Sequence, residues 1–285
     1  MNLLHLALLA ASVRVCSGSV KRGLIYIPNE AWPQDDSVWI QDGSTLTWYY
    51  TYGDQPNPRY KSPQSALEFV PMMWGMGGNP DDTSFRDSII KQLEAGANIR
   101  YVLSFNEPDM RSDWGGSNIE PAKAARGYIA NMLPLKERGI KIGLPAVSGA
   151  SWGIQWLREF AGNCTEVLNE KCQYDFLPVH WYGNFGGLKA HIDEATHEFP
   201  DAKIWVTEYA FAHQTLETTK GFYYESAAYL ESSEIVERYS YFGAFRSQVS
   251  NVGANATFLN RAGQLTEIGL RYLGLEGNGV EPTSG

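Results

Sequence analysis

Positive charge is scarce in this chain of 285 residues, which has 23 lysines and arginines against 32 aspartates and glutamates. The formal net charge of −9 leaves no basic excess with which to neutralise phosphate groups. Nucleic acid and anionic membrane surfaces are therefore excluded as expected partners, and a neutral substrate is favoured.

Motifs for cofactor, metal and serine chemistry are also missing. The first predicted strand is followed by Ile27-Pro28-Asn29-Glu30, and the chain has no G-x-G-x-x-G motif and no P-loop. The five histidines form no H-E-x-x-H pattern, the cysteines form no cluster at ligand spacing, and no G-x-S-x-G occurs. We therefore expect no cofactor, no metal ion and no serine triad.

Long apolar runs are absent after the first stretch, and the C-terminus carries no hydrophobic anchor tail. Residues 3–11 are apolar but too few to span a bilayer, and small residues follow them. This pattern predicts a secretory signal peptide, with a short propeptide, over residues 1–22, and a protein secreted to the extracellular space or cell wall. Lys21-Arg22 is either a dibasic processing site or a pair of charges flanking the first strand.

Cysteine is rare, with three residues in the whole chain. Cys16 falls in the predicted signal, which leaves Cys164 and Cys172 close together in sequence. In an oxidising compartment this pair predicts one disulfide, and two free buried thiols are the alternative. The triplets that begin at Asn163 and Asn255 match the N-glycosylation pattern and predict glycan sites on surface loops.

Apolar segments alternate with helical patterns from residue 23 onwards. The alternation predicts parallel strands joined by helical crossovers, and eight repeats predict a compact, single-domain α/β fold, a (β/α)8 TIM barrel over residues 23–274. A loose tail over residues 275–285 is expected. An open doubly wound sheet is the second possibility, but it would need the missing phosphate-binding turn. The expected strands are 23–28, 47–53, 68–75, 98–106, 141–148, 174–182, 203–209 and 236–245.

The expected helices cover 83–95, 121–138, 154–161, 188–199, 221–232 and 265–273, and several of them end at a glycine or a proline. Gly162, for example, directly follows the third of these segments and predicts its end. The connections over residues 29–46 and 54–67 are rich in proline, glycine, aspartate and asparagine, so helices there should be short or irregular.

Two of the apolar segments stop abruptly at a glutamate. Glu107 ends the fourth predicted strand and Glu208 ends the seventh, so in a barrel both side chains lie at one mouth. Glycoside hydrolysis uses a pair of carboxyl groups. They lie about 5 Å apart in enzymes that retain the anomeric configuration and roughly 6.5–9.5 Å apart in enzymes that invert it. The alternative for Asn106-Glu107-Pro108 alone is an N-terminal cap on a following helix.

Aromatic residues make up 13% of the chain and include 9 tryptophans and 16 tyrosines, which suit either a core or a sugar-binding cleft. Strand alternation favours His180 and Tyr182 pointing inward, with Trp181 pointing away, and Tyr209 is expected to turn into packing. Trp114 lies in a glycine-rich loop and is the best lid-like aromatic. The candidate substrate-binding residues are Asn106, Trp74, Trp114, His180, Tyr182 and Phe211.

The segments L-S-F-N-E-P-D at 103–109 and W-V-T-E-Y at 205–209 together resemble glycoside hydrolase family 128, whose members are clan A retaining (β/α)8 enzymes. The resemblance extends to M-W-G at 73–75 and H-W-Y-G at 180–183. It implies a β-1,3-glucan hydrolase, expected to be endo-acting and monomeric, with Glu107 as acid/base and Glu208 as nucleophile. A β-glucan-binding module with little turnover, or a clan A glycosidase of another linkage specificity, are the alternatives.

Overall fold

The computed structural model describes residues 20–60 and 67–285, so the predicted signal peptide up to residue 19, with Cys16, lies outside the described residues. The described residues form eight strands, each within or close to an expected segment, and the first five are much shorter than expected. They are β1 (Gly23–Ile25), β2 (Trp48–Tyr50), β3 (Glu68–Phe69), β4 (Tyr101–Val102), β5 (Lys141–Ile142), β6 (Phe176–Tyr182), β7 (Lys203–Ala210) and β8 (Val236–Tyr241).

All paired strands run parallel, in the sheets β1-β2-β3, β4-β5 and β6-β7-β8. Isolated parallel bridges connect these sheets: Met72 with Leu103, and Gly143 with Phe176. A further parallel bridge joins Arg22, just before β1, to Tyr239 in β8. Successive strands are therefore neighbours throughout, and the last strand lies beside the first.

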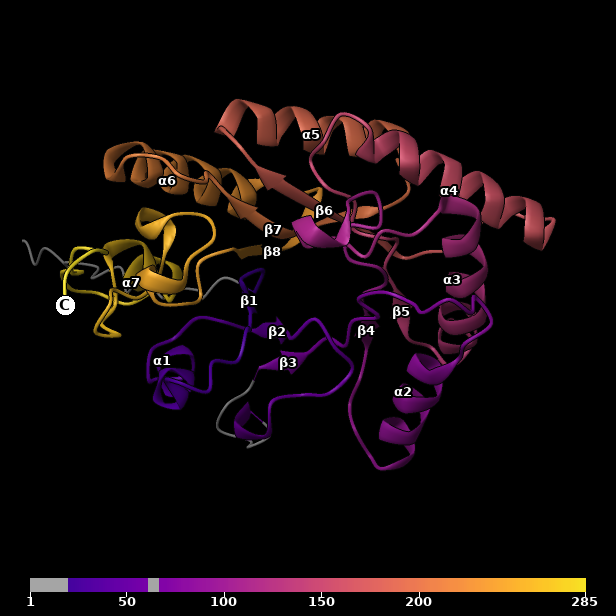
Figure 1. Cartoon of the computed structure of the whole chain (residues 1–285), viewed down its shortest axis with the longest axis horizontal. Coiled ribbons are helices and arrows are strands. Elements are labelled where there is room, and N and C mark those ends of the chain that lie inside the picture. The colour runs from indigo at the N-terminus through magenta and orange to yellow at the C-terminus, as the bar shows by residue number, and fades with distance from the viewer. Residues whose placement is uncertain (1–19, 61–66) are drawn as a thin grey trace, which may run out of the picture.

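The described residues also form seven α-helices, and the longer ones, α2 to α6, lie around the outside of the strands (Figure 1). Between β1 and β2 the only α-helix is the four-residue α1, as the composition of that connection predicts. Within residues 20–60 and 67–285, no helix is long and apolar enough to cross a membrane. The helices are α1 (Asp36–Trp39), α2 (Ser84–Glu94), α3 (Pro121–Lys136), α4 (Gly153–Leu168), α5 (Phe185–Glu198), α6 (Leu216–Ser232) and α7 (Glu267–Tyr272).

Helix α4 corrects one prediction, because it continues past Gly162 to Leu168. The helix ends instead at Asn169, whose φ of 53° is the left-handed conformation typical of a C-cap. Asn163 consequently lies in a helix and not in the expected surface loop, and its side-chain amide donates to the carbonyl oxygen of Glu159 at 2.7 Å. Asn255 lies in a short 3-10 turn and is half-buried.

The predicted disulfide between Cys164 and Cys172 is present. It ties the last turns of α4 to the segment that leads into β6. Because the bond closes a loop of a few residues, its removal is expected to cost about 2–3 kcal/mol of stability in the chain-entropy description.

The chain beyond α7 corrects a second prediction, since hydrogen bonds attach it to the rest of the fold although most of its residues are exposed. The amide of Val280 donates to the carbonyl of Leu265 at 3.0 Å, and the amide of Arg261 donates to the carbonyl of Ser284 at 3.2 Å. Pro282 is buried. Hydrogen bonds to a distant loop, invisible in the local composition, hold this segment in place.

Lys21 and Arg22 are both engaged by the fold, which favours their interpretation as charges flanking a strand. The Lys21 ammonium donates to three carbonyl oxygens at the end of α6, including that of Ser233 at 2.8 Å. The Arg22 Nε donates to Glu231 and to the hydroxyl of Tyr239, both at 2.9 Å. Cleavage after Arg22 would remove all of these contacts.

A nearly buried cation, Arg238, lies at the amino-terminal end of the strand region. The Arg238 guanidinium lies 4.4 Å from the ring centroids of both Tyr101 and Trp205 and donates to Glu68 at 2.6 Å. Glu68 also accepts from Arg100, whose side chain is 60% exposed against 11% for Arg238. One carboxylate thus joins a nearly buried arginine and an exposed one.

We expect Arg238→Ala to lower the free energy of unfolding by about 3 kcal/mol, because it removes the less exposed of the two partners of Glu68 and empties the space between the Tyr101 and Trp205 rings. The matched control Arg100→Ala, which removes an exposed partner of the same Glu68, should cost less than about 1 kcal/mol. Urea unfolding followed by tryptophan fluorescence measures both. Equal losses in the two variants would contradict this interpretation.

Candidate active site

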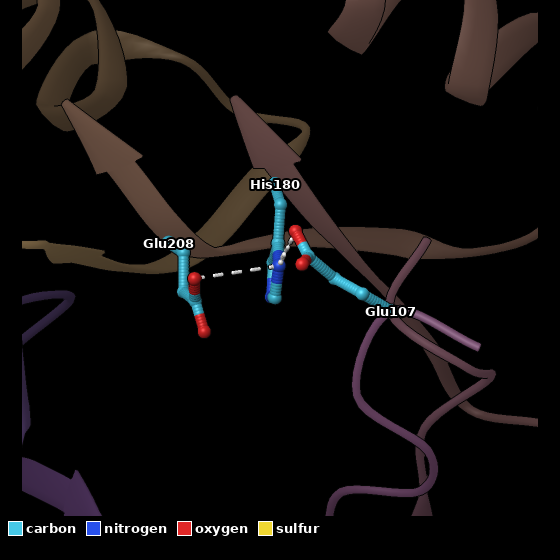
Figure 2. A group of neighbouring side chains, drawn as sticks. All are labelled: Glu107, His180 and Glu208. Atoms are coloured by element: carbon cyan, nitrogen blue, oxygen red, sulfur yellow. Dashed lines mark hydrogen bonds and ion pairs between the residues drawn. The ribbon is translucent and has the colours of Figure 1, made fainter. Parts of the chain in front are cut away.

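Glu107, His180 and Glu208 meet at the carboxyl ends of the strands (Figure 2). His180 lies in β6 and Glu208 in β7, and the parallel register pairs these two residues directly. A register shift between Val179 and His180 produces this pairing. Glu107 follows β4, on the segment that continues from that strand.

The imidazole of His180 lies between the two carboxyl groups (Figure 2). Its Nδ1 is 3.0 Å from Oε1 of Glu107 and 3.6 Å from Oε2 of Glu208, and its Nε2 is 3.1 Å from the hydroxyl of Thr207. The facing side-chain atoms of Glu107, His180 and Glu208 all lie within 4.8 Å of one another. His180 is fully buried and Glu208 nearly so, while Glu107 is slightly more open.

Tyrosine hydroxyls surround the Glu208 carboxylate. Tyr182 donates to its Oε2 at 2.6 Å, and Tyr52 donates to its Oε1 at 2.5 Å. Tyr50 lies farther away, at 3.4 Å from Oε1. Burial and the Glu208 charge raise the pKa of each of these tyrosines well above its usual range, so all three stay protonated and act as donors. Hydroxyl donors favour the ionised form of the carboxylate that accepts them.

Opposing effects set the protonation of the central groups. Burial raises the pKa of Glu208, and the nearby charge of Glu107 raises it further. The charge of His180 and the hydrogen bonds from Tyr182 and Tyr52 lower the same pKa. The net effect is a raised pKa for Glu208. For His180, burial alone lowers the pKa, but the charges of Glu208 and Glu107 outweigh it and leave the pKa raised. The two carboxylates therefore favour a charged imidazole between them.

Glu107 is held in an unusual backbone conformation. Its φ of 39° lies in the left-handed region, which residues other than glycine seldom adopt. Its amide donates to the carbonyl of Ala146 at 2.7 Å, and its carbonyl accepts from the amide of Met110 at 3.0 Å. Non-glycine residues in such conformations cluster at functional sites, because the surrounding structure must hold them there.

The helix-cap alternative for Asn106 does not hold, since no α-helix begins beside it; the next element is the 3-10 turn Ser112–Trp114. The Asn106 amide nitrogen donates to the carbonyl of Gly115 at 3.3 Å. Within the described part of the chain its Oδ1 has no hydrogen-bond partner, although the side chain is buried. A buried acceptor of this kind is available to a ligand hydroxyl.

A cavity of about 640 Å³ opens above the two glutamates. Four of the six predicted binding residues line it: Asn106, Trp74, Trp114 and Tyr182. Trp114 is 62% exposed and Trp74 is 38% exposed, so both rings are accessible at the cavity wall. The other lining residues are Ile27, Tyr52, Glu107, Met110, Gly115, Ser148, Gly149, Ala150, Trp181, Glu208, Ala212, Phe242, Asn251 and Val252.

The remaining two predicted binding residues, His180 and Phe211, are not among those that line the cavity. His180 lies instead between the two carboxyl groups. Phe211 does not line the cavity, which corrects its prediction: its ring packs on Phe222 of α6 at 5.7 Å. Tyr209 is buried in packing, as expected.

Tyr52 and Trp181 are two of the cavity residues that were not among the predicted binding residues. Tyr52 follows β2 and binds Glu208, and a tyrosine at the end of a predicted strand was the available signal. Trp181 packs on α5, as expected for a side chain that points away: its indole lies 5.5 Å from the ring of His191, and it also reaches the cavity wall. A Cβ atom at Gly187 would come within 2.1 Å of this ring. The glycine leaves the room that the indole needs against α5, while Tyr182, the next residue, points to Glu208.

Glu107, His180 and Glu208 are also the described side chains with the spacing to hold a metal ion. Their facing atoms are already engaged, however: His180 bonds Glu107, while Tyr52 and Tyr182 use both oxygens of Glu208. A bound cation would have to displace these hydrogen bonds. The donor set therefore suits a hydrogen-bonded carboxylate pair better than a metal site.

Parallel strands with outer helices, and two strand-end carboxylates in an aromatic-lined cavity, are the features of a glycoside hydrolase core. Residues 23–272 match the family described as glycosyl hydrolase catalytic core. A curdlan-specific exo-β-1,3-glucanase of family 128 from Blastomyces gilchristii, solved with glucose, is 30% identical, with a TM-score of 0.69 over 90% of this chain and 98% of that one. This chain belongs to glycoside hydrolase family 128.

Two further proteins show the range of similarity. Alkali-sensitive linkage protein 1 from Schizosaccharomyces pombe is 31% identical over 267 residues, which are 90% of this chain and 45% of that protein. The chain thus spans about half the length of the curated relative it matches. An oligosaccharide-binding protein of family 128 from Cryptococcus neoformans is 24% identical, with a TM-score of 0.66 over 90% of this chain and 93% of that one, a likeness of fold alone.

Proposed function

We propose that this protein hydrolyses β-1,3-glucan with retention of configuration, on a closed (β/α)8 barrel. The observation that carries the mechanism is the close approach of Glu107 and Glu208, whose facing oxygens lie within 4.8 Å. Retaining glycosidases have carboxyl groups about 5–5.5 Å apart, whereas inverting enzymes need roughly 6.5–9.5 Å to admit a water molecule. The bridge between β8 and the residue before β1 supports closure of the barrel.

Glu208 is the nucleophile in this proposal, because the donors Tyr52 and Tyr182 stabilise its ionised form. It attacks the anomeric carbon and forms a covalent glycosyl–enzyme bond while Glu107 donates its proton to the departing glycosidic oxygen. Glu107 then removes a proton from water, and the resulting hydroxide breaks the glycosyl–enzyme bond. His180 positions the Glu107 carboxyl group through its Nδ1.

The choice of β-1,3-glucan rests on the relative from Blastomyces gilchristii, which is described as a β-1,3-glucanase. Two strand-end carboxylates do not themselves encode a linkage. We propose endo action, as the sequence resemblance implies, although that relative is described as exo-acting. We also propose secretion, because a disulfide persists in an oxidising compartment.

Product analysis on laminarin tests the proposal. The expected result is a ladder of β-1,3-linked oligosaccharides whose newly formed ends, followed by proton NMR within the first minutes, carry the β configuration. Release of glucose alone would indicate exo action. An α product would overturn the retaining mechanism, and cleavage of β-1,4-mannan or cellulose with laminarin left intact would overturn the linkage.

Oligosaccharide binding without turnover is the second candidate, because the fold is shared with a protein of that description. Retention of the protein on insoluble β-1,3-glucan, with no reducing ends released over a long incubation, is the result that would favour it. The presence of both glutamates at hydrolytic spacing favours the enzyme, because binding alone does not require that spacing.

The tyrosine donors predict a shift in the pH profile. The nucleophile must be ionised, so activity falls as pH drops through the pKa of Glu208. The hydrogen bond from Tyr52 lowers that pKa, so Tyr52→Phe should raise it and move the acidic limb of kcat/KM to higher pH. Tyr209→Phe is the control, because the Tyr209 hydroxyl has no hydrogen-bond partner among the described residues. An unchanged limb in Tyr52→Phe would contradict the assignment.

A further inference from the structure

A second cavity, of about 350 Å³, adjoins the one above the glutamates. Ile27, Phe242 and Asn251 line both, so the two cavities form one continuous depression. Its walls come from the segment between β1 and α1 and from the segment that follows β8. The volume is within the range of small-molecule sites, roughly 300–1,000 Å³.

Trp32 lines this second cavity and is fixed from one side. The guanidinium of Arg246 lies 4.6 Å from the Trp32 ring centroid. Two nitrogens of that guanidinium donate to Asp35 at 2.7 and 2.8 Å, and a third donates to the carbonyl of Arg261 at 3.1 Å. Because Arg246 is buried and occupied in this way, it fixes the indole in place at the wall of the cavity.

Polar side chains accompany this ring. Asn29 and Asn251 line the same cavity and carry amide groups that can bond hydroxyls, whereas the carboxylate of Asp36 already accepts from Tyr26 and Asn57. Phe245 and Val249 add apolar surface. An aromatic platform ringed by a few hydrogen-bonding groups suits a sugar, which has an apolar face and a hydroxylated edge.

The position of the second cavity relative to Glu107 and Glu208 indicates which end of the glucan substrate it would bind. The second cavity lies by β1 and beyond β8, and β8 pairs with β7, which carries Glu208. Glu107, which protonates the leaving group, follows β4 on the other side of the site. A sugar in the second cavity therefore belongs to the part of the substrate that becomes bonded to Glu208, the glycone.

We propose that the second cavity binds a glucosyl unit of the glycone, away from the bond that is cleaved, with Trp32 as its stacking platform. This subsite rests on the proposed β-1,3-glucanase function. It makes cleavage depend on the number of glucose units on the Glu208 side. The substrate preference of this chain is thereby set partly by a residue outside the catalytic cavity.

Aryl β-laminari-oligosaccharides with one to four glucose units before a constant leaving group test the proposal. In the wild type, kcat/KM should rise with glycone length. Trp32→Ala should reduce the ratio of kcat/KM for the longest to the shortest substrate by about tenfold, the scale of one aromatic contact. Trp152→Ala, which removes an exposed tryptophan outside both cavities, should leave that ratio unchanged.

Trp32→Leu guards against a folding defect, since it keeps apolar bulk over Arg246 while removing the ring, and it should show the same loss. An undiminished length dependence in both variants would overturn the subsite while leaving the glucanase assignment intact. Calorimetric titration of laminarihexaose into Glu208→Gln separates the two proposals. Weaker binding on adding Trp32→Ala supports the subsite even without turnover, and no binding of laminarihexaose at all would overturn both.

Discussion

Glu208→Ala should lower the hydrolysis of laminarin by about 10⁴-fold or more, because no covalent intermediate can form without the nucleophile. The variant should still fold and bind laminari-oligosaccharides, since the aromatic walls of the cavity remain. Reducing-end release measures the loss. Glu217→Ala, which changes an exposed glutamate in the first turn of α6, is the matched control and should retain full activity.

Adding azide to Glu208→Ala tests whether Glu208 is the nucleophile. In Glu208→Ala, the space left by the carboxylate admits azide, which attacks the anomeric carbon of an aryl β-laminarioside from the face that Glu208 used. The expected product is an α-glycosyl azide, because a single displacement inverts the configuration. A β-glycosyl azide, or full activity without azide, would show that Glu208 is not the nucleophile.

Glu107→Ala should lower the hydrolysis of laminarin by about 10²–10⁴-fold, the usual contribution of a general acid and base. The first step should be far less affected for a substrate with a dinitrophenyl leaving group, which departs without protonation. The variant should therefore release a burst of dinitrophenol and then turn over slowly, because the second step still lacks its base. Stopped-flow absorbance resolves the two phases.

Azide should accelerate the slow phase of Glu107→Ala and give a β-glycosyl azide, since it attacks an intermediate that Glu208 has already formed. The opposite configurations from the two variants assign the two roles independently of rate. Equal losses for laminarin and for the dinitrophenyl substrate in Glu107→Ala would argue against proton donation by Glu107. In that case the positive φ of Glu107 would need another explanation.

Local pattern was enough to predict the strand-ending glutamates and the elements that carry them. Glu107 and Glu208 each follow a largely apolar segment, and in parallel α/β folds the carboxyl ends of strands meet at one face. The inward orientation of Tyr182 and the Cys164–Cys172 bond were predictable for similar reasons. Strand period and short sequence separation are local properties.

Predictions from the local sequence pattern were wrong where contacts with residues distant in the chain decide the structure. Gly162 is a good helix terminator, yet α4 continues because its apolar face keeps packing as far as Leu168, and Asn169 adopts the left-handed conformation instead. The segment after α7 looked loose by composition but is held by the carbonyl of Leu265. Phe211 was placed in the cavity by its nearness to Glu208 in sequence, and it turned to α6.

The sequence by itself determined the class of protein, the eight strand segments and the two catalytic candidates, because each depends on residue type and spacing along one stretch of chain. Only the tertiary structure decided that Tyr52 binds Glu208, that His180 lies between the carboxylates, and that Trp32 rests on Arg246. Each of these contacts joins residues that are far apart in the chain. Their distances are fixed by the order and register of the parallel strands, which no single segment encodes.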